Sequence, residues 1–169
     1  MTEEAGEIAD KARRVIEAYT ARGLKIATAE SCTGGMIAAA LTDIAGSSAV
    51  LDRGFVTYSN EAKIAMIGVD PESLAADGAV SETVARQMAE GTLRAANADV
   101  AISVTGIAGP GGGSSAKPVG LVHFACAGNG MTRHVEKRFG DLGRSAIRGA
   151  SVRVALDLLL EAVRDQPAC

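Results

Sequence analysis

The chain has 169 residues, enough for one domain with a sizeable core, and we expect a single domain over residues 1–169. Hydrophobic residues make up 47% of the chain and charged residues 22%, an ordinary globular composition that excludes a disordered polypeptide. The net charge of −3 and the aromatic share of 3% provide neither the basic footprint nor the stacking side chains of a nucleic-acid binder. We therefore expect no nucleic-acid partner.

The N-terminus and the cysteines favour a cytoplasmic protein without a metal site. The N-terminus is charged and amphipathic rather than of signal-peptide type, and no run of about 18 apolar residues predicts a membrane span. The three cysteines, Cys32, Cys126 and Cys169, are odd in number and widely spaced, which does not indicate a disulfide framework. With only two histidines beside them, they also predict no metal-ligand cluster.

Hydrophobic periodicity predicts helices and strands that alternate along the chain. Gly23 ends the first helix and Ser81 caps a later one, while a short Gly-Asn-Gly turn joins two strands as a hairpin. The predicted helices cover residues 3–22, 36–44, 60–67, 81–96 and 143–163, and the predicted strands cover residues 24–29, 49–58, 99–105, 119–127 and 131–139.

Alternating strands and helices are typical of a largely parallel sheet covered on both faces. The hairpin adds an antiparallel portion to this sheet. The sequence therefore predicts an α/β fold, a three-layer α/β/α sandwich with a mixed, mostly parallel sheet of about five strands. Apolar helices and an open sheet edge favour a homodimer.

Ser31 stands where an apolar strand ends and a helix led by two glycines begins. Free backbone N–H groups at a helix start can bind an anion or a developing oxyanion, and glycines let a ligand approach the backbone closely. A hydroxyl at this place is well positioned as a nucleophile, although Ala29 occupies the first glycine position of the Gly-x-Ser-x-Gly elbow. Taken alone, the local pattern favours a helix cap at Ser31 or Thr33.

A serine nucleophile needs a base, and lysine is the candidate. Both histidines lie on the predicted hairpin strands with no acid at a suggestive spacing, so a Ser-His-Asp triad is not supported. Lys63 lies in a polar segment at a strand end, and it would need a pKa lowered from ~10.4 to about 7, a change worth about 4.6 kcal/mol. Burial or a neighbouring cation must supply this energy, whereas a solvated lysine paired with Glu61 is the simpler local interpretation.

Thr105 and Gly106 end an apolar strand and begin a glycine-rich loop. Ligands of open α/β sheets bind beyond the carboxyl ends of strands, so both residues are candidates for ligand contact. The loop over residues 106–118 matches neither the dinucleotide fingerprint nor the P-loop, and we expect no cofactor. A flexible surface loop is the alternative interpretation.

Arg144 and Arg148 are four residues apart and share one face of the last predicted helix. They lie in its first two turns, where the helix dipole disfavours cations. Either acids such as Asp141 neutralise them, or they face an anionic ligand such as a phosphate.

Five motifs occur in one order along the chain: Ala29–Gly35, Gly54–Lys63, Gly78–Ser81, Thr105–Pro110 and Lys117–Gly120. Together they resemble the C-terminal domain of the CinA competence/damage-inducible family. The resemblance extends from about residue 7 to residue 163, and stand-alone members of this family are nicotinamide-nucleotide amidohydrolases.

The resemblance implies that a small-molecule nucleotide, nicotinamide mononucleotide, is hydrolysed to nicotinate mononucleotide and ammonia through a serine–lysine dyad and an acyl-enzyme. By motif, Ser31 is the nucleophile, Lys63 is the base and Tyr58 assists them. We expect further substrate contacts from both halves of the chain, with backbone amides at the oxyanion and arginines at the ribose-phosphate end. These contacts are Thr33, Gly34, Gly35, Asn60, Thr105, Gly106, Arg144 and Arg148.

Two other hypotheses fit parts of the sequence. A non-catalytic nucleotide-binding module of the same family would use the glycine loops and arginines without chemistry, and it would keep Lys63 charged. Cysteine chemistry at Cys32 is the other, because a helix start favours a thiolate, although cysteine is more often a small buried hydrophobe. The nucleotide-processing activity of the extra N-terminal domain in longer family members is not expected from these residues.

Overall fold

A five-stranded mixed sheet with the strand order β2-β1-β3-β4-β5 forms the middle layer of the structure. The structure, a computed structural model, describes residues 3–166. The strands are β1 (Ile26–Glu30), β2 (Leu51–Val56), β3 (Val100–Gly106), β4 (Leu121–Gly128) and β5 (Met131–Arg138). β1 pairs in parallel with β2 and β3, whereas β4 is antiparallel to both β3 and β5. The predicted mixed sheet of about five strands is confirmed, with parallel pairing confined to β2, β1 and β3.

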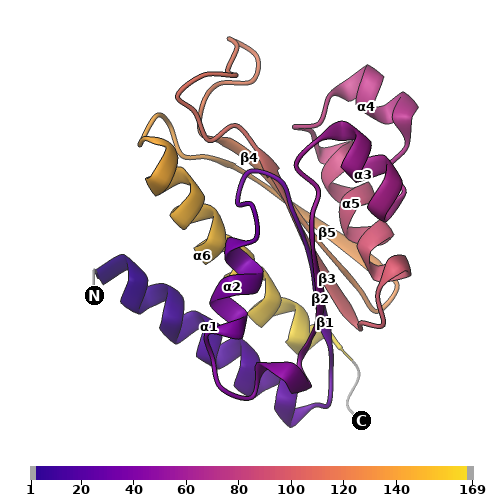
Figure 1. Ribbon diagram of the computed structural model, residues 1–169, viewed down its shortest axis with the longest axis vertical. Coiled ribbons are helices and arrows are strands. Elements are labelled where there is room, and N and C mark those ends of the chain that lie inside the picture. The colour runs from indigo at the N-terminus through magenta and orange to yellow at the C-terminus, as the bar shows by residue number, and fades with distance from the viewer. Residues whose placement is uncertain (1–2, 167–169) are drawn as a thin grey trace.

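Helices cover both faces of this sheet and complete the predicted three layers (Figure 1). The helices on one face are α1 (Glu3–Ala21), α2 (Met36–Thr42) and α6 (Arg144–Asp165), and those on the other are α3 (Asn60–Ile67), α4 (Pro71–Asp77) and α5 (Glu82–Ala95). Successive strand residues face opposite layers. Ile26 of β1 therefore packs in the larger cluster with α1 and α6, whereas Ala29 packs in the smaller cluster with Met88 of α5.

β1 is buried along its whole length because it has a strand on each side and helices on both faces. Its last residue, Glu30, pairs with Val56 of β2 and with Val104 of β3. The segments that follow these three parallel strands therefore leave the sheet at one edge. The rule that ligands bind beyond the carboxyl ends of parallel strands points to this edge.

The structure differs from the prediction at two places in the first half of the chain. α4 was not predicted, although Asp70 caps it through the N–H of Glu72 and Pro71 stands in its first turn, which is a start signal visible in the sequence. The strand predicted over residues 49–58 is shorter, because residues 47–49 form a 3-10 turn and β2 ends at Val56. This early end releases the chain before Tyr58, so that it turns toward α3.

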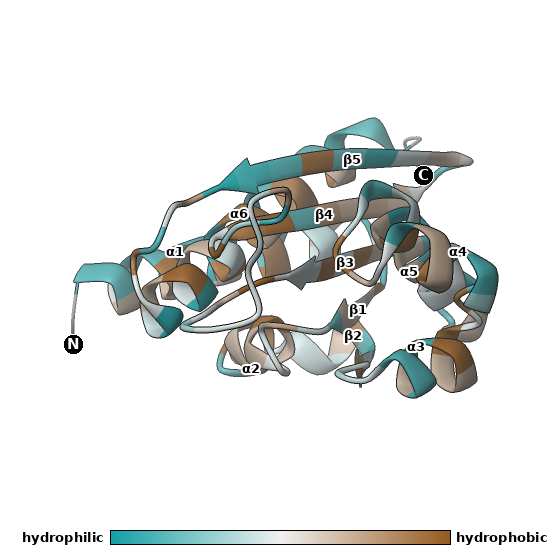
Figure 2. Ribbon diagram, turned by 90° about the horizontal axis from the view of Figure 1, so that it is seen from above, coloured by the Kyte–Doolittle hydropathy of each residue, from teal (hydrophilic) through white to brown (hydrophobic). Residues whose placement is uncertain are grey.

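The predicted hairpin forms, and its second strand, β5, is an edge strand of the sheet. Asn129 and Gly130 both have positive φ, at 50° and 72°, as a two-residue hairpin turn requires, while Gly128 remains in β4. β5 is hydrophilic over much of its length (Figure 2). Charged side chains on an edge strand discourage pairing with another chain. Among the described helices, none combines the length and apolar character needed to cross a bilayer.

Gly91 of α5 lies where α3 packs closely against α5. A Cβ added at Gly91 would lie 1.8 Å from the carbonyl oxygen of Ile67, the last residue of α3. We predict that Gly91→Ala lowers the free energy of unfolding by about 1–3 kcal/mol, because backbone must move to make room. Urea denaturation measures this change.

Gly6 of α1 is the matched control, because an added Cβ there meets nothing within 4 Å. Gly6→Ala should raise the stability by up to about 1 kcal/mol through helix propensity alone. Equal effects of the two substitutions would contradict the close approach of α3 to α5.

Candidate active site

The side chains of Ser31 and Lys63 meet at the edge where β1 ends. Ser31 follows the last residue of β1, and its backbone N–H donates to the carbonyl oxygen of Val104 at 3.0 Å. Lys63 lies in α3, the helix that follows β2, and its Nζ donates to Ser31 Oγ at 3.1 Å. Two residues that are 32 positions apart in the sequence are thus in direct hydrogen-bond contact.

Lys63 is 1% exposed and its two acceptors carry no charge. Besides Ser31 Oγ, Nζ donates to the carbonyl oxygen of Thr57 at 2.8 Å, and in the described residues no carboxylate pairs with it. Burial therefore lowers the pKa of Lys63, while the nearby Cys32 opposes this shift. The solvated lysine paired with Glu61 is not what the structure shows.

The turn between β1 and α2 carries Ser31 and has left-handed backbone at Gly34 and Gly35, with φ of 60° and 100°. Two of its amides are already engaged. The N–H of Gly34 donates to the carbonyl of Ser31 at 3.0 Å, and that of Gly35 donates to Glu30 Oε2 at 3.1 Å. Of the three amides predicted to face substrate, only that of Thr33 has no acceptor in the described part of the chain.

Arg148 of α6 binds two carbonyl groups of the same turn. Its Nε donates to the carbonyl of Cys32 at 3.0 Å, and its Nη2 donates to the carbonyl of Thr33 at 3.1 Å. α6 thereby fixes the backbone next to the candidate nucleophile. Neither Asp141 nor another acid neutralises Arg148 in the described residues, because these carbonyls take its hydrogen bonds.

Arg144 joins two other segments of the site. Its Nη1 donates to the carbonyl of Gly109 in the glycine-rich loop at 3.0 Å, and its Nη2 donates to the hydroxyl of Tyr58 at 3.1 Å. Tyr58 is 60% exposed, and in the described structure its hydroxyl makes no hydrogen bond with Ser31 or Lys63. The structure thus brings Tyr58 to the rim of the site and leaves Ser31 and Lys63 in direct contact.

The remaining predicted contacts differ in how accessible they are. Thr105 is buried and its hydroxyl donates to the carbonyl of Ala79 at 2.8 Å, which ties β3 to the loop before α5. A Cβ at Gly106 would lie 2.7 Å from Val122 Cγ2, so β4 packs closely against this glycine. Asn60 is exposed in the first turn of α3, after Ser59, whose side chain caps that helix.

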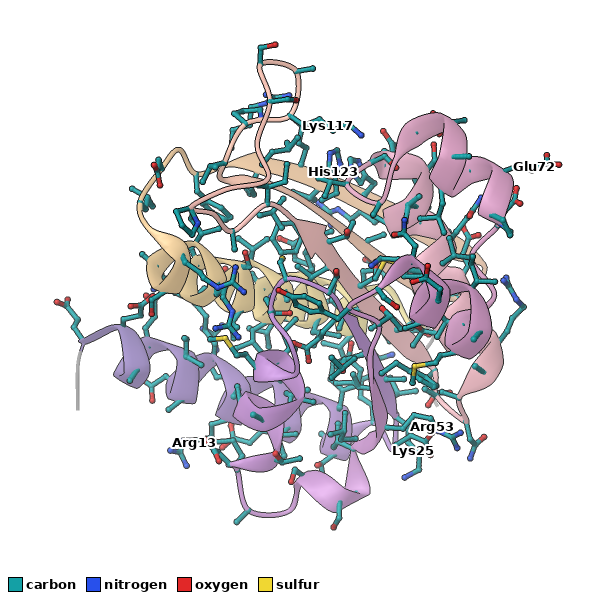
Figure 3. All side chains as sticks on the ribbon, turned by 45° about the horizontal axis from the view of Figure 1, so that its top comes forward. Arg13, Lys25, Arg53, Glu72, Lys117 and His123 are labelled. Atoms are coloured by element: carbon teal, nitrogen blue, oxygen red, sulfur yellow. The ribbon has the colours of Figure 1, made fainter. Side chains whose placement is uncertain are left out.

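The histidines lie elsewhere. His123 of β4 and His134 of β5 are hydrogen-bonded to each other at 2.9 Å. His123 lies beside Lys117, beneath the glycine-rich loop, and both line a groove with residues of the loop before α5 (Figure 3). Neither histidine is bonded to Ser31 in the described structure, whereas Lys63 is. No group of three or more metal-ligating side chains is found among residues 3–166.

Glu30 and the carbonyl of Thr57 are the site features that sequence reasoning missed. Glu30 is fully buried, and its carboxylate accepts hydrogen bonds from three amides at the start of α2. Glu30 lies within a motif that the sequence made visible, but its type and position alone do not indicate which groups it binds. Thr57 contributes a backbone atom, for which the sequence carries no signal.

Together these features define an α/β protein with a serine–lysine pair at the carboxyl edge of a three-layer sandwich. The family model of the CinA C-terminal domain matches residues 8–163. The chain belongs to the CinA C-terminal domain family.

Curated relatives of this family match most of the chain. "Nicotinamide-nucleotide amidohydrolase PncC" of Escherichia coli K12 is 55% identical over 156 residues, which cover 90% of this chain and 93% of that protein. A "putative competence-damage inducible protein" of Caldicellulosiruptor saccharolyticus is 49% identical over 150 residues, 88% of this chain but only 36% of the longer relative.

Solved structures agree with the fold. The crystal structure of the competence/damage inducible protein CihA from Agrobacterium tumefaciens has a TM-score of 0.93 and 57% identity, covering 97% of this chain and 99% of that one. A competence damage-inducible protein A from Klebsiella pneumoniae has a TM-score of 0.90 at 40% identity, covering 95% and 99% of the two chains.

Cys32 allows a direct test of the cysteine hypothesis. Burial raises the pKa of its thiol to about 11, and the side chain is 6% exposed. We predict that iodoacetamide at pH 7.5 alkylates native Cys32 roughly a hundredfold or more slowly than the unfolded chain, because little thiolate is present. Peptide mapping by mass spectrometry, with and without urea, measures the two rates. Equal rates would restore Cys32 as a candidate nucleophile.

Proposed function

We propose that this protein is a nicotinamide-nucleotide amidohydrolase that converts nicotinamide mononucleotide to nicotinate mononucleotide and ammonia. The observation that carries the proposal is the 3.1 Å hydrogen bond between Lys63 Nζ and Ser31 Oγ, formed by a buried lysine whose acceptors are all uncharged. The relative from Escherichia coli supports the substrate class, because it has that name, is 55% identical to this chain and is matched over 93% of its length.

Lys63 acts as the base in the first step. Burial favours its neutral form, which has a free lone pair that can take the proton of Ser31. Ser31 Oγ then attacks the carboxamide carbon of the substrate. The hydrogen bond to the carbonyl of Thr57 orients Nζ toward Ser31. It also stabilises the ammonium group that forms, because a hydrogen bond from a charged donor to a carbonyl oxygen is stronger than one from a neutral donor. Tyr58 lies at the rim and is not needed to relay this proton.

The negative charge on the tetrahedral intermediate needs donors, and the backbone supplies at least one. The N–H of Thr33, which has no acceptor in the described structure, is the amide we assign to the oxyanion. Arg148 strengthens this donor by bonding the carbonyl of Cys32, which belongs to the same peptide group as that N–H. Substrate binding at this point replaces a missing hydrogen bond and requires no rearrangement of Gly34 or Gly35.

The protonated Lys63 then completes the reaction. It donates its proton to the departing amide nitrogen, which leaves as ammonia, and Ser31 remains as an ester of the nicotinate group. A water molecule attacks this ester while Lys63 takes one of its protons. Collapse of the second intermediate returns that proton to Ser31 Oγ and releases nicotinate mononucleotide.

Arg144 and Arg148 enter this function mainly as organisers of the site. Both guanidinium groups already donate to carbonyl oxygens, and Arg144 also donates to Tyr58. Arg144 is exposed and retains surface for the phosphate end of a nucleotide, whereas Arg148 is half-buried and bonded to the turn. We therefore assign ribose-phosphate binding to Arg144 together with the exposed Asn60, and assign Arg148 to support of the turn.

Removal of the nucleophile tests the proposal. Ser31→Ala should lower kcat for ammonia release from nicotinamide mononucleotide by roughly 10⁴-fold or more, because no acyl-enzyme can form. Ser48→Ala, which changes an exposed serine in the 3-10 turn, is the matched control and should leave kcat unchanged. Substantial turnover by Ser31→Ala would refute the assignment of the nucleophile.

The pH profile tests Lys63. Because the base must be neutral, kcat/KM should rise as the pH increases through the pKa of Lys63, and burial places that rise below the ~10.4 of a free lysine. Lys63→Ala should lower kcat by about 10²–10⁴-fold and abolish the rise, whereas exposed Lys137→Ala on β5 should preserve both. If the wild-type protein binds the nucleotide in a thermal-shift assay but releases no ammonia, the result would instead favour a non-catalytic binding module.

A further inference from the structure

Glu30 is a fully buried acidic residue that the reaction described above does not use. It directly precedes Ser31 and is 0% exposed. Its Oε2 accepts from the N–H groups of Gly35 at 3.1 Å and Ile37 at 3.0 Å, and its Oε1 accepts from that of Ala38 at 2.9 Å. An isolated buried carboxylate is costly, but here three amides, the hydroxyl of Thr28, which donates to Oε1 at 3.4 Å, and the positive end of a helix dipole satisfy it.

This contact replaces an ordinary helix cap. α3, α4 and α5 are each capped locally by the side chain of their own N-cap residue, which is Ser59, Asp70 or Ser81. The N-cap of α2 is Gly35, which has no side chain and has left-handed backbone. Glu30 supplies the missing acceptors from a position five residues earlier. No side chain of the N-cap residue caps α2, and the hydroxyl of Ser31 is bonded to Lys63 instead.

The backbone of Glu30 is itself held on both sides. Its carbonyl accepts from the N–H of Thr57, and the next residue, Ser31, donates its N–H to Val104. Glu30 therefore connects the centre of the sheet to the first turn of α2, and the five-residue turn that bears Ser31 is closed between two fixed ends. Thr57 also provides the carbonyl that Lys63 binds, so one strand end positions both members of the pair.

We propose that Glu30 is a positioning residue for acyl transfer, and that its carboxylate, by fixing the start of α2, holds Ser31 Oγ opposite Lys63 Nζ and the Thr33 amide toward the reacting carbonyl. This inference rests on the proposed function, in which Ser31 attacks an amide. Glu30 does not touch the substrate. Its effect is geometric, and a displacement of about 1 Å at a reacting group can cost about a hundredfold in rate.

Glu30→Gln is the test, because it keeps the shape of the side chain but replaces one acceptor oxygen with an NH₂ donor. One carbonyl oxygen remains for two amides, and the NH₂ group opposes the third. We expect kcat for ammonia release from nicotinamide mononucleotide to fall about a hundredfold with KM nearly unchanged. We expect the second-order rate of Ser31 labelling by a fluorophosphonate, which phosphonylates activated serine hydroxyls with loss of fluoride, to fall by a similar factor.

The pH profile separates positioning from a simple charge effect. Removal of a nearby negative charge, acting electrostatically, would shift the rise in kcat/KM to lower pH, because it disfavours the protonated form of Lys63. Positioning instead predicts an unchanged pH for that rise and a lower plateau. A shifted rise with the plateau retained would overturn the proposal, and so would unchanged kcat and unchanged labelling in a folded variant.

Two further variants keep the outcome interpretable. Val163→Ala removes part of a buried side chain near the end of α6, and this control for general destabilisation should retain kcat and labelling. If Glu30→Gln does not fold, Glu30→Asp keeps the charge but withdraws the carboxylate by one methylene, and a labelling rate within about twofold of the wild type would overturn the proposal. A wild-type protein that is labelled at Ser31 but releases no ammonia would refute the proposed function, while the labelling comparison would still decide the role of Glu30.

Discussion

The amino group of Lys63 is buried without a counter-ion among the described residues, and this constraint organises the candidate site. A charged ammonium in such a place is penalised by lost hydration, and two uncharged acceptors compensate only in part. The penalty shifts the residue toward the neutral form that a base requires. The fold therefore has to keep water away from Lys63 while leaving Ser31 accessible to a substrate. α3 serves both needs, because Lys63 lies on its buried side with Ile67 and still reaches Ser31 Oγ.

Sheet topology makes this arrangement possible. β1 and β2 are parallel neighbours, so the residues after them emerge at the same edge, where Ser31 and Thr57 flank Lys63. An antiparallel pairing of the same two strands would send one of them to the opposite edge. The hairpin of β4 and β5 lies on the other side of β3 from β1. Its polar second strand, β5, forms the edge of the sheet and contributes nothing to the serine–lysine pair.

The turn that carries Ser31 is stabilised from two directions by opposite charges. The buried carboxylate of Glu30 binds amides, and Arg148 of α6 binds carbonyls. Each charged group therefore pairs with the backbone groups of complementary polarity, which orders a segment containing two left-handed glycines. The conflict between arginines and a helix N-terminus is resolved in the same way, since carbonyl dipoles rather than carboxylates accept from Arg144 and Arg148.

Local patterns in the sequence were sufficient for most of the fold. Periodicity located the helices and strands, Ser81 caps α5 as predicted, and Asn129 and Gly130 form the hairpin turn. These features depend on neighbouring residues, so a single chain reveals them. α4 was missed, although Asp70 and Pro71 marked its start. The order of motifs resembled one family, and that resemblance rather than periodicity paired Ser31 with Lys63.

What the sequence by itself determined is thus the α/β class, the strand-turn-helix setting of Ser31 and the family. The tertiary structure alone decided that Lys63 is buried and bonded to Ser31, that Tyr58 is held at the rim by Arg144, and that Glu30 caps α2. The physical reason is that burial and hydrogen-bond partners are set by strand order and helix packing. Those contacts join residues far apart in the chain, and no local pattern encodes the environment that shifts a pKa or orients a carboxylate.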